Sequence, residues 1–256
     1  MTIYTYQPQE LIDKVNKRGF IYVDFAKTNL YRQSQLPGRN MEAYHEAYMW
    51  MARKLAEKTG IWMKTVYGSD LDIQKDADGD YIDEEGQKLP IFPFWGWYIT
   101  DGKKENPDES YCFDRGADDS DEMDWNLNWG QTRLVTLEIP DRLVLLSDAN
   151  AWYCALEGRP CYEFETEEDE QLKTEAYQAR FQDLLMGEND TNKKEIAQEL
   201  WVELTTSWEN ILRTEGRRLR CFEGPYGKTI MEKYDIQAAF PVIFKEWIVS
   251  VEEVWQ

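Results

Sequence analysis

Histidine is almost absent from this chain, since His45 is the only one among 256 residues. Metal sites built on several histidines are therefore excluded, and a cysteine–histidine or serine–histidine nucleophile pair would have to use His45. This residue lies in an expected helix over Met41–Lys58, and we interpret it as a structural or surface side chain. The sequence also lacks an HExxH motif, a nucleophile elbow and a glycine-rich phosphate loop of either standard type.

Cysteine is scarce and long apolar runs are missing. The four cysteines, Cys112, Cys154, Cys161 and Cys221, include no CxxC pair, which is typical of reduced thiols. No apolar run reaches the length of about eighteen residues that a membrane span requires. The first eleven residues have neither the basic start nor the apolar core of a signal peptide. These features together predict a cytoplasmic protein with no membrane partner.

Positive charge is in short supply, with 29 Lys and Arg against 49 Asp and Glu and a net charge of −20. Such a charge repels phosphate backbones, so direct binding of nucleic acid is disfavoured, whereas a basic protein partner is favoured. Aromatic residues are plentiful at 14%, including eleven Trp. Most are expected to be large core residues, although rings can also line a ligand pocket.

The acidic stretch DIQKDADGDYIDEEG spans residues 72–86 and invites comparison with a calcium loop. With Gly79 at position 6 of an EF-hand, Asp76, Asp78 and Asp80 take positions 3, 5 and 7, but position 1 is Gln74. Flanking glycine and proline also leave no room for the two helices of that motif. Because Asp-Gly is a strong turn signal, we predict an acidic hairpin with no bound metal.

Periodicity and turn residues predict the following elements. Strands are expected at Thr2–Tyr6, Phe20–Asp24, Leu89–Thr100, Arg133–Pro140, from Leu143, over Ile236–Phe244 and over Trp247–Val251. Helices are expected at Pro8–Arg18, Met41–Lys58, Thr166–Met186 and Lys193–Arg213, with a short one capped by Asp148. Strands at both ends with helices between them predict one mixed α+β domain over residues 1–256. It would have an antiparallel-rich sheet with flanking helices and acidic insertions near 70–86 and 101–124.

Several phrases resemble a known family when taken in order. They are YTYQ (Tyr4–Gln7), RGFIYVD (Arg18–Asp24), EAYMWM (Glu46–Met51), WGWY (Trp95–Tyr98), VTLEIPDRLVLLSDANAWY (Val135–Tyr153), SWENIL (Ser207–Leu212) and IQAAF (Ile236–Phe240). As a set they resemble a bacterial family described only as domain of unknown function 3841. The resemblance spans nearly the whole chain outside the acidic insertions, and the family implies no activity.

The layout of the two ends is similar to ADP-ribosyltransferase-like folds, which implies NAD bound in a cleft between two sheets. The residues expected to line that pocket are Gln7, Tyr22, Trp97, Tyr98 and Gln237. Those folds carry Arg or His on the first strand and a catalytic Glu on a closing strand. Here the first strand has Gln7 instead, the closing triplet is Gln237-Ala238-Ala239, and Glu246 is off position.

The sequence therefore leaves two alternative functions open. One is an ADP-ribosyltransferase-like protein that binds NAD and lacks the expected catalytic pair. The other is a non-enzymatic acidic protein that binds a basic partner, such as a nucleic-acid-binding or defence protein, as an inhibitor or decoy. Its partner surface would be Asp76, Asp78 and Asp80.

Overall fold

The computed structural model describes residues 1–23, 42–62, 76–79, 81–82, 86–100, 104, 132–163, 167–186, 190–214, 220–224, 227–231 and 235–254. The chain forms two compact units. Unit 1 consists of Met1–Leu146 with Gln237–Gln256, and unit 2 of Ser147–Ile236. The predicted acidic insertion near 101–124 lies outside the described residues apart from Lys104, and a single domain over the whole chain stays a prediction.

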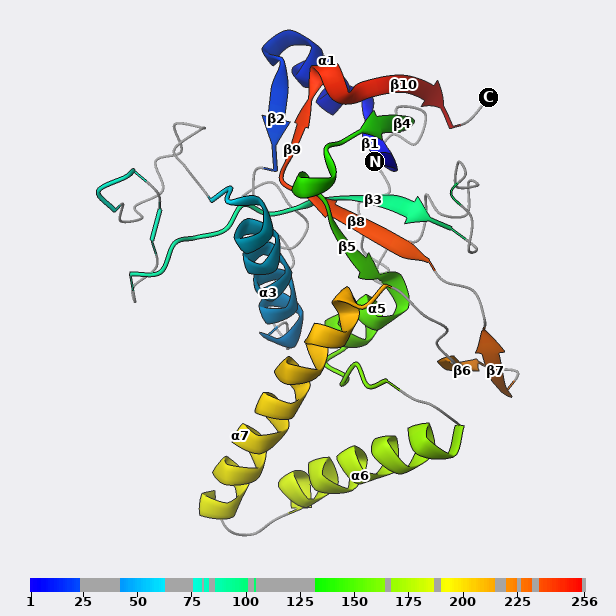
Figure 1. Cartoon of the computed structure of the whole chain (residues 1–256). Helices are drawn as coiled ribbons and strands as arrows, with labels where there is room; N and C mark the ends of the chain where they lie inside the picture. Colours follow the sequence, from blue (N-terminus) through cyan, green and yellow to red (C-terminus); the bar gives the residue numbers. More distant parts are fainter. Residues whose placement is uncertain are drawn as a thin grey trace. The chain divides into compact units, whose positions relative to one another are not determined.

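A six-stranded sheet in the order β10-β4-β1-β3-β8-β5 organises the described fold (Figure 1). Its strands are β1 (Thr2–Pro8), β3 (Phe94–Ile99), β4 (Thr132–Glu138), β5 (Leu145–Asp148), β8 (Ile236–Phe240) and β10 (Ile248–Glu253). Strand β4 pairs antiparallel with β1 and β10, and β1 pairs antiparallel with β3. The predicted α+β class with an antiparallel-rich sheet and helices is therefore confirmed.

One face of this sheet carries the main apolar core and is called the core face here. Ile3, Val135, Leu137, Phe94 and Phe240 belong to it, and their side chains are at most 6% exposed. Helix α1 (Gln9–Arg18) contributes Ile12 and Val15 to the same cluster, while β2 (Phe20–Tyr22) and β9 (Val242–Phe244) contribute Ile21 and Ile243. Figure 1 shows α1 beside the β2–β9 ribbon.

Local sequence explains how α1 ends where it does. Gly19 follows the helix with φ 86°, a left-handed conformation that glycine adopts at little cost. Its N–H donates to Val15 O at 2.8 Å, and Lys17 and Arg18 place positive charge in the last turn, where the helix dipole favours it. The chain can then turn directly into β2.

Helix α3 (Glu42–Thr59) buries the predicted stripe only in part. Met51 and Leu55 are fully buried, whereas Tyr44 and Tyr48 are half-buried. Three alanines, Ala47, Ala52 and Ala56, complete the buried side of the helix. Small residues on that side allow the helix to approach neighbouring elements closely. One of these elements is the 3₁₀ turn η3 (Asp141–Leu143).

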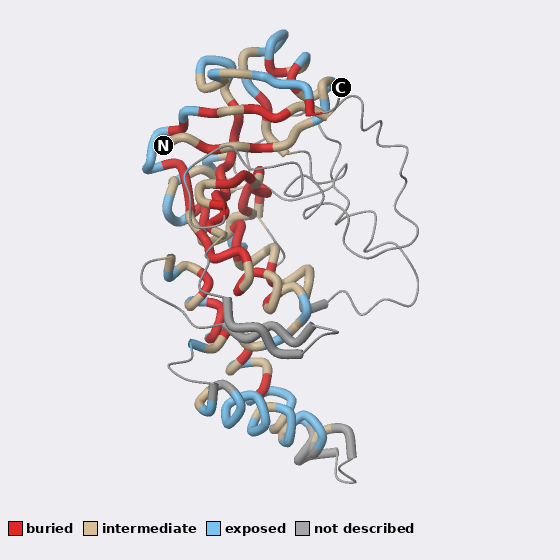
Figure 2. The backbone as a smooth tube through the Cα atoms, turned by 90° about the vertical axis from the view of Figure 1, so that its right-hand side faces the viewer, coloured by how far each residue is buried: buried red, intermediate tan, exposed pale blue. Residues whose placement is uncertain are grey.

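Unit 2 is mostly helical. It contains α5 (Ala149–Leu156), α6 (Glu167–Met186), α7 (Asp190–Ser207), the 3₁₀ turn η4 (Trp208–Leu212) and a hairpin of β6 (Arg220–Gly224) with β7 (Gly227–Met231). The predicted cap of α5 is confirmed, because Asp148 Oδ1 accepts from the N–H groups of Asn150 and Ala151 at 3.0 and 3.2 Å. Along α6, no side chain that the structure describes is buried, as its pale blue tube in Figure 2 shows.

Four sequence expectations need correction. The strand expected over Leu89–Thr100 is shortened to β3, because Pro90 and Pro93 cannot donate to a ladder. The helix expected over Lys193–Arg213 tightens into the η4 turn. Ile236–Phe244 is broken at Pro241, so that β8 enters the large sheet and β9 pairs with β2. The β6–β7 hairpin was not expected.

Among the helices described here, none has the length and apolar character needed to cross a bilayer.

Candidate functional site

Gly96 identifies which side chains of β3 share a face of the sheet. A Cβ placed on Gly96 would lie 2.5 Å from Ile3 Cγ2 and 3.4 Å from Phe240 Cε1, so Gly96 faces the core. Because successive strand residues alternate, Trp95 and Trp97 must point to the opposite face, called the reverse face here. Trp97 is 3% exposed there. The Trp95 ring meets the Tyr48 ring of α3 edge-on, with their centroids 6.1 Å apart.

Gln237 lies on the same reverse face, on the neighbouring strand β8. Ala238, the next residue, belongs to the core cluster, so alternation directs the Gln237 side chain away from it. The side chain is fully buried, and neither Nε2 nor Oε1 has a hydrogen-bond partner within the described part of the chain. A buried amide without partners is rare in folded proteins and calls for an explanation.

The other residues expected in the pocket lie elsewhere in unit 1. Gln7 lies on the core face with Ile3 and Thr5, since every second residue of a strand shares a face. Its Nε2 donates to Thr5 Oγ1 at 2.8 Å. Thr5 Oγ1 in turn donates to Trp95 O at 2.6 Å. Tyr98 also packs against the core cluster, and its hydroxyl and ring both contact the Lys104 ammonium. Gln7 and Tyr98 therefore do not share a face with Trp97 and Gln237.

Tyr22 belongs to the two-stranded ribbon rather than to the large sheet. Its neighbour Ile21 enters the core cluster, so Tyr22 points to the opposite side of the ribbon, the side of its register partner Val242. There its ring meets Phe20 edge-on at a centroid distance of 5.6 Å. The five residues expected from the sequence are thus divided among three places, and the structure brings only Trp97 and Gln237 onto one face.

The predicted turn at Asp78-Gly79 is confirmed, whereas the residues that would pair on either side of it to form the acidic hairpin lie largely outside the described residues. Gly79 N–H donates to Asp76 O at 3.1 Å, and Asp78 N–H donates to Asp76 Oδ1 at 2.9 Å, which closes an Asx-type turn. Lys88 Nζ lies 3.3 Å from Asp76 Oδ2 and 3.8 Å from Asp78 Oδ2. One lysine thus offsets part of this acidic charge. Asp80 lies outside the described residues.

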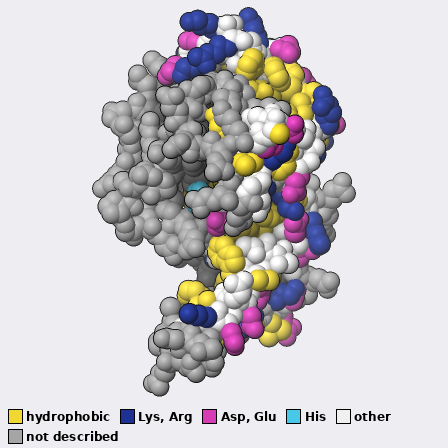
Figure 3. Space-filling view, turned by 90° about the vertical axis from the view of Figure 1, so that its left-hand side faces the viewer, with side chains coloured by type: hydrophobic (Ala, Val, Ile, Leu, Met, Phe, Trp, Pro, Cys, Tyr) yellow, Lys and Arg dark blue, Asp and Glu magenta, His cyan; other side chains and the backbone are white. Residues whose placement is uncertain are grey.

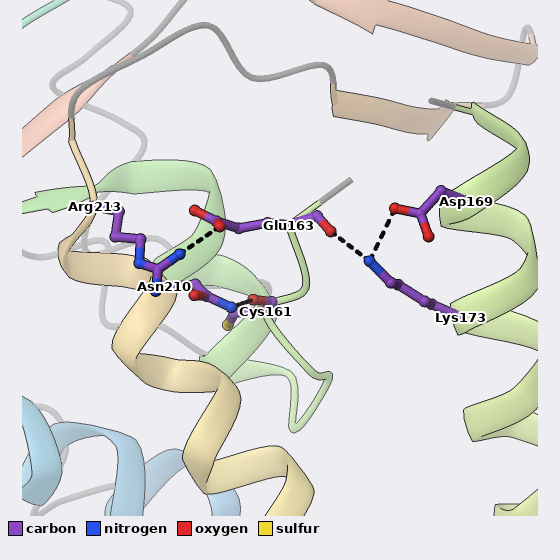
Figure 4. A network of polar contacts seen from close by, with 6 residues as sticks. All are labelled: Cys161, Glu163, Asp169, Lys173, Asn210 and Arg213. Atoms are coloured by element: carbon purple, nitrogen blue, oxygen red, sulfur yellow. Dashed lines mark hydrogen bonds and ion pairs between the residues drawn. The ribbon is translucent and has the colours of Figure 1, made fainter. Parts of the chain in front are cut away.

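Unit 2 contains a polar network around Cys161 and Glu163 (Figure 4). Asn210 Nδ2 donates to Cys161 O at 2.8 Å, and Arg213 NH1 donates to Glu163 Oε2 at 2.6 Å. Lys173 Nζ of α6 donates to Glu163 O at 2.9 Å and also pairs with Asp169. Each of these residues has a partner within the protein. The network joins the segment before α6 to η4, to Arg213 and to α6 itself.

Two other side chains of unit 2, Cys161 and Tyr162, are of types that take part in catalysis in some proteins. Burial raises the pKa of the Cys161 thiol, which donates to Ala151 O at 3.1 Å, so Cys161 is a poor nucleophile. Burial and a hydrogen bond to Glu203 raise the pKa of Tyr162. Glu203 also accepts from Arg180. These residues form a structural network, because each polar group is satisfied by the protein itself.

His45 stands alone on α3, as the sequence suggested. Its side chain is 42% exposed, and the contact to Glu46 Oε1 is long at 4.0 Å. Across the described residues, no group of three or more His, Cys, Asp and Glu side chains is arranged to hold a metal ion. Sequence reasoning missed that the described residues supply no hydrogen-bond partner to the Gln237 amide, because a strand pattern gives a residue's face but not its hydrogen bonds.

Comparison with protein-family models, with curated proteins and with solved structures gave no match to this chain. The likeness to domain of unknown function 3841 and to ADP-ribosyltransferase-like folds therefore rests on the sequence phrases alone. The reverse face with Gln237 and Trp97 is the candidate site that the structure itself supplies.

Proposed function

We propose that unit 1 is a nucleotide-binding module whose ligand is NAD, held at the reverse face by Gln237 and Trp97. The observation that carries this proposal is the fully buried Gln237 amide, for which the described residues supply no hydrogen-bond partner. Leaving such an amide without partners costs about 1–3 kcal/mol in proteins. A ligand that presents one donor and one acceptor side by side would recover that cost.

NAD offers this pattern at both of its ends. The nicotinamide carboxamide has an adjacent oxygen acceptor and NH₂ donor, and the adenine edge offers N7 and N6–H₂, which a glutamine amide can bind through two hydrogen bonds. The neighbouring strand supplies Trp97 on the same face, and an indole ring can stack on either flat heterocycle. Because Trp97 is only 3% exposed, such stacking requires the segments that cover it to move apart. An amide and a ring on adjacent strands therefore suit a nucleotide base better than an aliphatic ligand.

The proposal concerns binding rather than catalysis. A transferase of this layout would place a glutamate two residues after Gln237, where this chain has the fully buried Ala239. Glu246 is exposed in the 3₁₀ turn η5 (Lys245–Trp247), on a different segment. Gln7 occupies the first strand near its end and is already bonded to Thr5. No acid–base pair at Gln237 is therefore proposed.

The test is titration of the protein with NAD, followed by calorimetry and intrinsic Trp fluorescence. Saturable binding is expected, and both Gln237→Met and Trp97→Phe should weaken it about tenfold or more. Tyr98→Phe is the matched control, since Tyr98 neighbours Trp97 in β3 but faces the core. Failure of the wild-type protein to bind millimolar NAD, or equal binding by Gln237→Met, would overturn the proposal.

A second candidate function is a non-enzymatic acidic protein that binds a basic protein partner. The observation that favours it is the exposure of Asp78, whose side chain is 78% exposed at the hairpin tip. Pull-down of the partner should fall steeply with salt and with Asp76→Asn, Asp78→Asn and Asp80→Asn together. Salt-independent capture, or capture unaffected by these changes, would count against it.

A further inference from the structure

A partly exposed aromatic cluster lies on the side of the β2–β9 ribbon that faces away from Ile21 and Ile243. Phe20 and Phe244 face each other across the two strands, with ring centroids 6.0 Å apart. Tyr22 meets Phe20 at 5.6 Å and Trp247 meets Phe244 at 4.7 Å, both edge-on. Phe20 is 36% exposed, and the other three rings are half-buried. Val242, which pairs with Tyr22 on the same side, is fully buried, and Trp247 also packs against the core cluster. The open part of this side therefore lies at its Phe20–Phe244 end.

Basic side chains border this cluster. Lys17 and Arg18 end α1 and are exposed, and the chain enters β2 one residue later. Lys245 N–H donates to Gly19 O at 2.8 Å, which brings the exposed Lys245 next to the same helix end. Figure 3 shows Lys and Arg side chains gathered at the top of the molecule beside a hydrophobic patch. We call these residues the basic–aromatic corner: Lys17, Arg18, Phe20, Tyr22, Phe244, Lys245 and Trp247.

The acidic groups near the corner leave it positive. Lys14 pairs with Glu10, whereas the exposed Asp13 accepts, among the described residues, only from the neutral Gln9 amide and keeps its negative charge. Glu246 is the remaining exposed carboxylate on this ribbon, beside Lys245. A local excess of Lys and Arg is unusual in a chain with a net charge of −20, where dispersed charge would be acidic. The positive groups at the corner therefore suit an acidic binding partner.

The ring geometry decides which class of acidic partner fits. Bases of single-stranded nucleic acid need open ring faces on which to stack. Here Phe20–Tyr22 and Phe244–Trp247 pack edge to face at 69° and 74°, and Phe20–Phe244 is tilted at 52°. Such a cluster offers mainly ring edges rather than a flat stacking platform. Aromatic residues with Arg at their border are the composition of protein–protein hot spots.

We propose that the basic–aromatic corner docks an acidic protein segment that inserts an apolar side chain among Phe20, Phe244 and Trp247. Carboxylates beside that side chain would pair with Arg18, Lys17 and Lys245. Arg18 can form a bidentate pair with a carboxylate, which fixes the register of the segment. This surface lies on the ribbon and is independent of the NAD proposal.

The experiment is selection of a random peptide library displayed on phage against the immobilised full chain. Enriched peptides should combine Asp or Glu with Phe, Leu or Trp, and a synthetic copy of the best one should bind measurably by fluorescence anisotropy. Arg18→Glu and Lys245→Glu should each weaken that peptide about tenfold, and more at low salt than at high salt. Phe20→Ala should weaken it similarly, but by the same factor at low and at high salt.

Two matched controls separate docking from general effects. Arg142→Glu reverses an exposed charge on η3, and Val249→Ala trims a side chain on β10 that is 63% exposed. Neither should change peptide affinity, and all variants should keep the wild-type thermal midpoint. Enrichment without acidic residues, equal losses in Arg142→Glu, or binding of oligo-dT that Arg18→Glu abolishes would each overturn the proposal, the last in favour of a nucleic-acid surface.

Discussion

Replacing Gln237 with methionine is expected to keep or raise the stability of unit 1 while removing ligand binding. The wild-type amide is fully buried on β8 with both polar atoms unpaired among the described residues. Its desolvation costs about 1–3 kcal/mol, and methionine is similar in length, unbranched and apolar. Volume-conserving changes of this kind usually cost less than about 1.5 kcal/mol through packing. The free energy of unfolding should therefore stay close to the wild-type value or rise by up to about 3 kcal/mol.

Urea unfolding followed by Trp fluorescence measures this change, and a thermal scan checks it. In a chain of this size, each kcal/mol corresponds to a shift of about 2–4 °C in Tm. Gln237→Ala is the control, because it also removes the amide but leaves a cavity, and it should be destabilising. A loss of about 1 kcal/mol or more in Gln237→Met would refute the reasoning, since it would mean that the amide is hydrogen-bonded in the folded protein.

Three further predictions concern packing and ionisation. Gly96→Ala should lower the free energy of unfolding by about 1–3 kcal/mol, because its Cβ would lie 2.5 Å from Ile3 Cγ2; unchanged stability in urea would contradict this close approach. The raised pKa of Tyr162 means that its contribution to stability is complete below about pH 10, the unfolded value, and is lost as pH rises from there through the folded-state value. Tyr162→Phe should therefore flatten the alkaline fall in stability measured by circular dichroism, and an unchanged slope would exclude Tyr162 as its source. Iodoacetamide should label the half-buried Cys154 before the buried Cys161 in the native protein, as peptide mass spectrometry can check; equal rates would show that Cys161 is accessible.

The sequence alone determined those elements whose signals are local. The α1 helix follows from an apolar pair at i and i+3 with Gly19 after it, and Asp148 caps α5 because a carboxylate fits the first turn of any helix. The Asp-Gly turn at Gly79 and the burial of Met51 and Leu55 also followed from local pattern. Each depends on residues within a few positions, so no knowledge of distant segments was needed.

Tertiary structure decided how distant segments share a face. Trp97 and Tyr98 are adjacent in sequence and were expected in one pocket, yet strand alternation sends their side chains to opposite faces of the sheet. Gln7 lay in the expected first strand, but only the tertiary structure shows that its side chain lies on the core face and donates to Thr5. The pairing of Phe20 with Phe244 joins residues from the two ends of the chain. Local sequence gives each residue's periodicity, whereas strand order and register, which depend on packing across the whole unit, decide which residues meet.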